Sequence, residues 1–328
     1  MTVDATWADI LTQAIFHTLV ASLFIEALVK GWQVAEPRQR IALRLLALGY
    51  PLVLFPALVV LGVERADESF RDSTAIFAAD AWGDLRLLGI GLDAWWLGAF
   101  AAGGTALFLL DFLPLFRRRG RPAPGKADED AVGRLDGALF PVARRIGVRA
   151  PPIRFVDSDV PMLFCTGVRR QEIVVSRGAL ALLDDEELEA AIAHELAHLA
   201  RHDPAVSWAI MVTRAIMFFN PAFQVVSRVI VRDAEHVADE RAAAATGHRL
   251  PLAAGLLTLH RATSRYAPVP RSLPFAAALT EPIEKAHARD LEVRCLRLLA
   301  PAPRPLRFGP ARLALAGATL TAVLYFVV

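Results

Sequence analysis

The chain has 328 residues and a formal net charge of only +2, and 55% of its residues are hydrophobic. Soluble domains usually have a smaller apolar share, so this composition favours a membrane protein, and the near-neutral charge argues against nucleic-acid binding. The only cysteines, Cys165 and Cys295, show no CxxC spacing, which argues against a disulfide framework and fits a reducing compartment.

Four apolar stretches approach the roughly 20 residues that a helix needs to cross the hydrocarbon core of a bilayer. We therefore expect about four transmembrane helices, at Ile10–Val29, Leu45–Val63, Leu87–Leu110 and Leu313–Val328. The last stretch is short, and residues 308–312 are expected to extend it.

Three ionisable residues, His17, Glu26 and Asp93, lie within or near these stretches. Ionisable groups inside a membrane often mark a functional site. Here Glu26 and Asp93 lie near the ends of their stretches, where their side chains can extend toward the interface. His17 and Glu26 fall on opposite faces of one helix, so we favour no functional role for these residues.

Basic residues collect in three connecting segments: between the first two stretches, after the third, and before the fourth. Arg44, Arg118 and Arg307 are examples from the three segments. Lysine and arginine prefer the cytoplasmic side, and four spans would place all three segments on that one side. We expect a multi-pass protein of a bacterial-type inner (cell) membrane, with both termini outside and the block between the third and fourth spans in the cytoplasm.

The most informative stretch is a predicted helix that carries His194-Glu195-Leu196-Ala197-His198. Asp184 and Glu187 form a capping-box pattern at its start. His194 and His198 lie one turn apart on one face, so both imidazoles can reach one metal ion. Glu195 is rotated by about 100° and can reach a water molecule there. Because zinc lowers the pKa of its water to about 7 and a nearby carboxylate can accept the proton, the pattern predicts a hydrolase with one Zn²⁺ per chain.

A third protein ligand is expected, because catalytic zinc usually has three. A predicted helix over residues 232–246 carries Glu235, His236 and Asp239. Glu235 can complete a His₂Glu site, and Asp239, one turn on, can orient a ligating imidazole. His236 is an alternative ligand, although it faces another direction. His202 lies about 12 Å along the axis from His194, too far to share the ion.

The apolar segment Val206–Val231 separates the two predicted site helices and is long enough to cross a membrane. If it crossed, His194 and Glu235 would lie on opposite sides and could not share one ion. Arg214 and the pair Asn220-Pro221 also interrupt it. We therefore predict a pair of helices near residues 206–231 that lies in or against the membrane and brings the site close to the bilayer surface.

Residues 162–168 and 172–176 predict a β-hairpin that turns at Arg169-Arg170-Gln171. An edge strand there could align a substrate peptide by β-addition, which makes Phe164, Cys165, Thr166 and Gly167 a candidate substrate strand. An ordinary core hairpin explains the pattern equally well. Cys165 is interpreted as a small core residue rather than a nucleophile, because no base is adjacent to it.

Stabilisation of the developing oxyanion is also expected in a peptidase site. Arg232, His236 and His202 are the candidates, and the sequence does not rank them.

Several motifs resemble known peptidase families. Glu235-His236-Val237-Ala238-Asp239 is similar to the E-x-x-A/C-D motif of gluzincin-like membrane peptidases, both the BlaR/MecR type and the HtpX and CAAX-prenyl types. The hairpin also resembles the one in these families. The BlaR/MecR type is favoured by two further segments, Arg201-His202-Asp203 and Phe219-Asn220-Pro221, and by the topology of three spans before the domain and one after it. The motif resemblance covers roughly residues 150–300. It implies that His194, His198 and Glu235 bind zinc and that Glu195 is the general base. No extracellular sensor follows the last span, so β-lactam sensing is not expected.

The sequence thus predicts a mainly α integral membrane protein with about four transmembrane helices and a cytoplasmic α+β zincin-like peptidase domain with a small β-hairpin or sheet. The expected parts are three transmembrane helices (1–116), a linker (117–130), the peptidase domain (131–307) and a last transmembrane helix (308–328).

The predicted function is cleavage of a cytoplasmic or membrane-proximal protein in regulatory signalling. An HtpX-like quality-control protease is the alternative, and a non-catalytic membrane scaffold with a structural zinc is an alternative of another class. The expected partners are a protein or peptide substrate and the lipid bilayer, with no nucleic acid.

Overall fold

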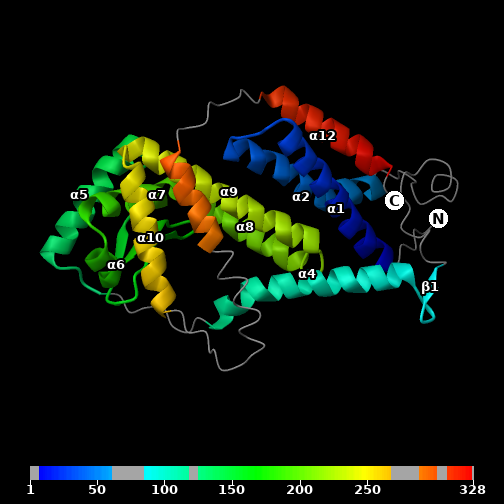
Figure 1. Ribbon diagram of the computed structural model, residues 1–328, viewed down its shortest axis with the longest axis horizontal. Helices are drawn as coiled ribbons and strands as arrows, with labels where there is room; N and C mark the ends of the chain where they lie inside the picture. The colour runs from blue at the N-terminus through cyan, green and yellow to red at the C-terminus, as the bar shows by residue number, and fades with distance from the viewer. Residues whose placement is uncertain (1–6, 61–84, 118–124, 267–287, 301–308, 327–328) are drawn as a thin grey trace. The chain divides into compact units, whose positions relative to one another are not determined.

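The computed structural model describes residues 7–60, 85–117, 125–266, 288–300 and 309–326 (Figure 1). The chain is mostly helical and divides into two compact units. The first unit consists of Met1–Arg119, Ile210–Asp233 and Pro303–Val328, and the second of Gly120–Ala209 and Ala234–Ala302. The division between them falls within two long helices, α8 (Asp203–Ile216) and α9 (Pro221–Thr246).

The first unit is a helical bundle. Its members are α1 (Trp7–Gly31), α2 (Pro37–Val60), α4 (Leu92–Arg117), α12 (Pro310–Tyr325) and the parts of α8 and α9 that belong to it. Helices α1, α2 and α12 share one apolar core, which includes Ile25, Leu43 and Leu320. A second cluster packs Leu48 of α2 against Phe223 and Ile230 of α9.

Two helices of the described chain are long and apolar enough to cross a membrane, Leu11–Gly31 within α1 and Ala94–Phe112 within α4. Helix α12 is apolar but shorter. The count of four spans and the cytoplasmic orientation stay predictions. Residues 61–63 of the second predicted span, residues 118–124 of the linker, and the basic residues Arg118 and Arg307 lie outside the described residues.

The third predicted span, Leu87–Leu110, is wrong at its start. A small β-hairpin of β1 (Arg86–Leu87) and β2 (Ile90–Gly91) precedes α4, which begins only at Leu92. Leu88 and Gly89 form its turn with positive φ angles of 55° and 80°. Such backbone angles are incompatible with a right-handed helix, so α4 cannot begin before this turn.

Glu26 is paired with another helix, and its extension toward a membrane interface stays a prediction. It forms a bidentate pair with Arg44 of α2, at 2.6 Å and 3.0 Å, and the same guanidinium contacts Asp233 of α9. Arg40 adds a contact of 2.7 Å with Asp233. Two cations thus balance two carboxylates at a largely buried junction of three helices, where an unpaired charge would be costly.

The turn between α8 and α9 is fixed against two other helices. The side-chain amide of Asn220 donates to the carbonyl of Ala14 and to the hydroxyl of Thr18, both on α1, at 3.0 Å and 2.9 Å. A Cβ on Gly104 of α4 would lie 2.4 Å from the carbonyl carbon of Phe219, so only glycine allows this approach. Helix α8, this turn and the first part of α9 cover residues 206–231, and their membrane association stays a prediction.

The second unit holds a three-stranded sheet in the order β3-β5-β4. Strands β4 (Leu163–Thr166) and β5 (Glu172–Ser176) form the predicted antiparallel hairpin. Strand β3 (Ile153–Val156) pairs with β5 in parallel and was not predicted. Helices α5 (Glu129–Ile146), α6 (Arg177–Leu182), α7 (Asp185–Leu199) and α10 (Arg249–Tyr266) gather around this sheet (Figure 1). One apolar core joins them, and β4 is left as an edge strand.

Candidate active site

Helix α7 is capped at its start and packed within the core of the second unit. Its predicted capping box is present: the Asp184 carboxylate accepts from the Glu187 amide at 2.8 Å, and the Glu187 carboxylate accepts from the Asp184 amide at 3.2 Å. Ala190, Ala193 and Ala197 are fully buried. Small side chains at these positions let neighbouring elements approach closely, so packing fixes the orientation of the histidines.

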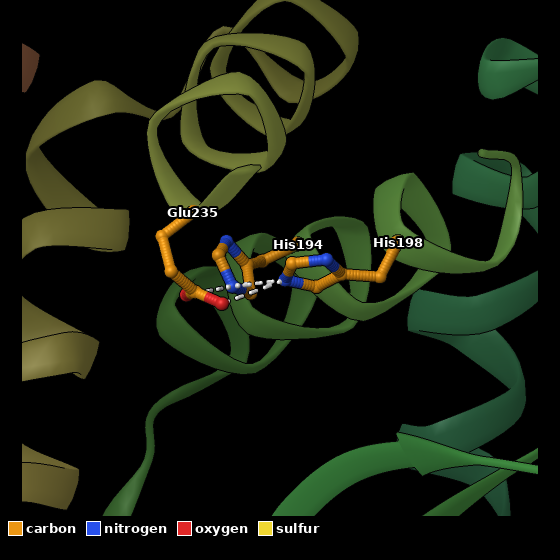
Figure 2. Close-up of side chains that lie close together, drawn as sticks. All are labelled: His194, His198 and Glu235. Atoms are coloured by element: carbon orange, nitrogen blue, oxygen red, sulfur yellow. Dashed lines mark hydrogen bonds and ion pairs between the residues drawn. The ribbon is translucent and has the colours of Figure 1, made fainter. Parts of the chain in front are cut away.

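The structure brings His194, His198 and Glu235 together (Figure 2). One ligand atom from each lies within 4.8 Å of the others. The two Nε2 atoms are 3.1 Å apart. The Glu235 carboxylate lies 3.4 Å from Nε2 of His194 and 3.5 Å from Nε2 of His198.

These separations fit a single tetrahedral metal ion. Zinc–nitrogen and zinc–oxygen bonds of about 2.0–2.2 Å at tetrahedral angles separate neighbouring ligand atoms by about 3.3 Å. The Nε2–Nε2 distance of 3.1 Å is close to that value, and each Nε2 lies near it from a different Glu235 oxygen, Oε2 for His194 at 3.4 Å and Oε1 for His198 at 3.5 Å. Two imidazoles and one carboxylate are also a donor set typical of catalytic zinc, with a position left for water or substrate.

A carboxylate contacts the outer nitrogen of each imidazole. Nδ1 of His194 lies 2.9 Å from Asp239, and Nδ1 of His198 lies 2.9 Å from Asp203. With the proton on Nδ1, the lone pair of each Nε2 faces the shared centre. The expected proximity of Asp239 is therefore observed. The sequence did not place Asp203 at the site, because its approach to His198 depends on the turn that ends α7.

Arg294 is a residue of this site that the sequence interpretation missed. It lies on a helix over residues 288–299 and donates two hydrogen bonds of 2.7 Å to Asp239. It also lies 3.1 Å from the Glu235 carboxylate. The Arg294 guanidinium thus contacts two carboxylates: that of Asp239, which orients His194, and that of Glu235, a candidate metal ligand. Arg294 is 55 residues from Asp239, so no local pattern links them.

The pKa values of His194 and Glu235 depart strongly from their ordinary values. Burial lowers the pKa of His194, but the contacts with Asp239 and Glu235 outweigh it and raise the pKa to about 10. Burial raises the pKa of Glu235, but His194 and Arg294 outweigh it and lower the pKa to about 2. Glu235 is therefore ionised at neutral pH, as a metal ligand must be.

Glu195 contacts the edge strand. Its carboxylate accepts a hydrogen bond of 2.7 Å from the backbone amide of Cys165. Burial, and then the neighbouring Glu195 charge, raise the pKa of the Cys165 thiol. A protonated thiol is a poor nucleophile, in keeping with the interpretation of Cys165 as a packing residue.

The three oxyanion candidates occupy different environments. His202 is exposed just after α7, with a φ of 56°, whereas Arg232 is exposed on α9. His236 is buried on α9. Their role stays a prediction.

Comparison with known proteins finds similarity to the same families as the motifs. Residues 143–281 match the family described as BlaR1 peptidase M56. A "Protease HtpX homolog" of Acidiphilium cryptum is 29% identical over 57% of this chain and 74% of the relative. Homologs of that name from Sulfurovum sp. and Pyrococcus abyssi are 29% and 28% identical, and the matches span 50% and 63% of those relatives.

These matches support a BlaR1/HtpX-type membrane metallopeptidase family. The resemblance drawn from the motifs is therefore confirmed. The matched region of the BlaR1 type contains α7 and the whole of α9, and so His194, His198 and Glu235.

If His194, His198 and Glu235 hold one Zn²⁺, Asp239→Asn is expected to lower the affinity for Zn²⁺ by about 10- to 100-fold. The amide keeps the shape of the side chain but loses the charge that holds Nδ1 of His194 and pairs with Arg294. Isothermal titration of the metal-free protein measures the change. Glu240→Gln on the same helix removes a pair with Arg297 and serves as the control. Equal losses in both variants would contradict the assignment.

Zinc binding is expected to depend on pH through His194. Its pKa of about 10 means that metal uptake at neutral pH must release a proton. The affinity should therefore rise by roughly tenfold per pH unit between about pH 6.5 and 8. Conversely, the His194 contacts stabilise the metal-free fold fully below pH about 6.5, and that contribution is lost as the pH rises through about 10. Competition for Zn²⁺ with a chelator whose own pKa values are known measures the affinity at each pH. An affinity that does not change with pH would exclude a protonated His194 imidazole.

Proposed function

We propose that the chain is a zinc-dependent endopeptidase of the membrane in which His194, His198 and Glu235 hold one Zn²⁺ and Glu195 is the general base. One observation carries the proposal: both Nε2 atoms and the Glu235 carboxylate converge, while carboxylates occupy both Nδ1 atoms. Arg294 and Asp239 support this arrangement from behind the ligands.

When bound, the ion would activate a water molecule and polarise the carbonyl of the scissile peptide bond. Glu195 follows His194 in sequence but is rotated by about 100° around α7, so it would reach a bound water rather than the ion. Its carboxylate accepts the proton of the attacking water and delivers it to the leaving amine nitrogen. The Cys165 amide keeps this carboxylate oriented while no substrate is bound.

The edge of β4 that faces away from β5 is the proposed place for the substrate backbone. The amide of Ser176 donates to the carbonyl of Met162, which points that carbonyl toward β5. Because backbone groups alternate along a strand, those of Leu163 and Cys165 point away from β5. The amide of Cys165 already reaches Glu195, so this edge borders the catalytic residue. An extended peptide added along Phe164, Cys165, Thr166 and Gly167 would pass beside the metal.

The HtpX-named relatives favour a quality-control protease over a dedicated signalling protease. A regulatory substrate stays a prediction without a supporting observation. We further propose a multi-pass topology with the second unit in the cytoplasm, which rests on the distribution of Arg and Lys along the chain. The scaffold alternative is disfavoured, because a structural zinc has no use for a carboxylate such as Glu195 beside an open position.

Metal removal tests the proposal. The purified full chain in neutral lipid nanodiscs should cleave an unfolded protein such as casein, lose this activity with a chelator, and regain it with one equivalent of Zn²⁺. His194→Ala should not be restored by Zn²⁺. Cleavage that survives complete removal of the metal would contradict the mechanism. Proteomics of cells with wild type or Glu195→Gln would then separate broad degradation from cleavage of one regulator.

A further inference from the structure

The loop that joins β4 to β5 has a fixed shape. Gly167 has a φ of 94°, and a Cβ there would lie 1.9 Å from the carbonyl oxygen of Arg170. Only glycine satisfies both constraints, so the turn presents the residues after Gly167 in a defined way. Those residues are Val168, Arg169 and Arg170, and all three are exposed.

The tip of this hairpin carries uncompensated positive charge. Within the described part of the chain, neither Arg169 nor Arg170 has an ion pair or a side-chain hydrogen bond. The acidic residue next along the chain, Glu172, already pairs with Arg154 at 3.0 Å. An unpaired double charge on a fixed turn is suited to an acidic partner.

The tip also lies at the carboxyl end of β4, the strand proposed to hold the substrate. Strand β4 runs from Leu163 to Thr166 and leads directly into the turn. Each residue advances the chain by at most about 3.4 Å, so Arg169 lies within about 14 Å of Cys165. An extended peptide on the open edge would cover that distance with about four residues.

We propose that Arg169 and Arg170 select substrates that carry Asp or Glu about four residues to the N-terminal side of the scissile bond. The inference rests on the proposed peptidase function and names a substrate class for it. The direction follows from antiparallel addition to β4, the more stable and more frequent pairing, which places the N-terminal part of the substrate beside the carboxyl end of β4.

The effect should be moderate, because the arginines are exposed to solvent. Exposed ion pairs contribute little individually, so two together should favour Glu over Gln by about three- to tenfold in kcat/KM. The preference should weaken as salt is raised from about 0.05 M to 0.5 M, because exposed charges are screened.

The test uses the full chain in nanodiscs of phosphatidylcholine, a neutral lipid. Matched peptides carry either Glu or Gln at each position from two to six residues on both sides of the cleaved bond. The double variant R169Q/R170Q should lose the preference, and R169E/R170E should invert it, so that Gln peptides are preferred over Glu peptides. R144Q/R149Q removes the same charge from exposed arginines that precede the opposite edge strand, β3, and should keep the wild-type preference.

Peptide binding to the Glu195→Gln variant, measured by fluorescence anisotropy, separates this inference from the proposed function. Preferential binding of Glu peptides without cleavage by the wild type would support the acidic selectivity and contradict the peptidase. Cleavage without a preference for Glu, or with a preference for Glu on the C-terminal side of the cleaved bond, would overturn this inference but leave the proposed peptidase function intact. A third result would also overturn the inference: R169Q/R170Q keeps the wild-type ratio of kcat/KM for Glu and Gln peptides but loses binding to phosphatidylserine vesicles. That result would show that the two arginines bind a lipid surface.

Discussion

Glu195→Gln is expected to lower kcat for peptide cleavage by about 100- to 10,000-fold while Zn²⁺ remains bound. The glutamine retains an oxygen that can accept the Cys165 amide, so the local structure is preserved. It cannot accept a proton, so the attacking water is no longer activated by a base. Single-turnover cleavage of a fluorogenic peptide, with zinc content measured by mass spectrometry on the same sample, gives both quantities.

The matched control is Glu189→Gln on the same helix. Glu189 pairs with Arg145 at 2.6 Å and belongs to no part of the metal cluster. The same loss of charge there should leave kcat within about twofold, as is usual for a peripheral surface position. Wild-type cleavage by Glu195→Gln at full zinc occupancy would exclude this residue as the base.

Glu235→Ala is expected to have the largest effect on the metal, with a loss of Zn²⁺ affinity well above about 100-fold. Glu235 is the only carboxylate of the three-residue cluster, and its pKa of about 2 makes it an ionised ligand throughout the physiological range. Its removal leaves two imidazoles, too few for a catalytic site. Cleavage should disappear together with the metal.

His236→Ala distinguishes between the two ligand assignments that the sequence left open. His236 is the next residue on α9 and is buried, but the metal cluster of described residues contains Glu235 instead. We expect His236→Ala to retain Zn²⁺ even if it destabilises the fold. Loss of the metal in His236→Ala with retention in Glu235→Ala would reverse the assignment.

The features that the sequence predicts best are local. The capping box at Asp184 and the spacing of His194 and His198 depend only on helical periodicity, and both appear in α7. The folding back of residues 206–231 follows from one constraint, that two distant residues share an ion, and the α8–α9 turn agrees with it.

The features that the sequence does not predict are contacts between distant elements. Arg294 reaches Asp239 from a separate helix, and Arg44 pairs with both Glu26 and Asp233. No periodic pattern marks such pairs, because each depends on how helices pack. The start of α4 was missed for a different reason: an apolar run such as Leu87–Gly91 suits a short hairpin as well as a helix.

X-ray absorption at the zinc edge tests the central claim most directly. In the purified full chain we expect one zinc per molecule, with two imidazole nitrogens and carboxylate or water oxygens at about 2.0–2.2 Å. Glu235→Ala should lose this signal, whereas Glu195→Gln should keep it. A sulfur shell near about 2.3 Å would place a cysteine on the metal, and that spectrum, or wild-type protein that binds no zinc, would contradict the His194–His198–Glu235 site.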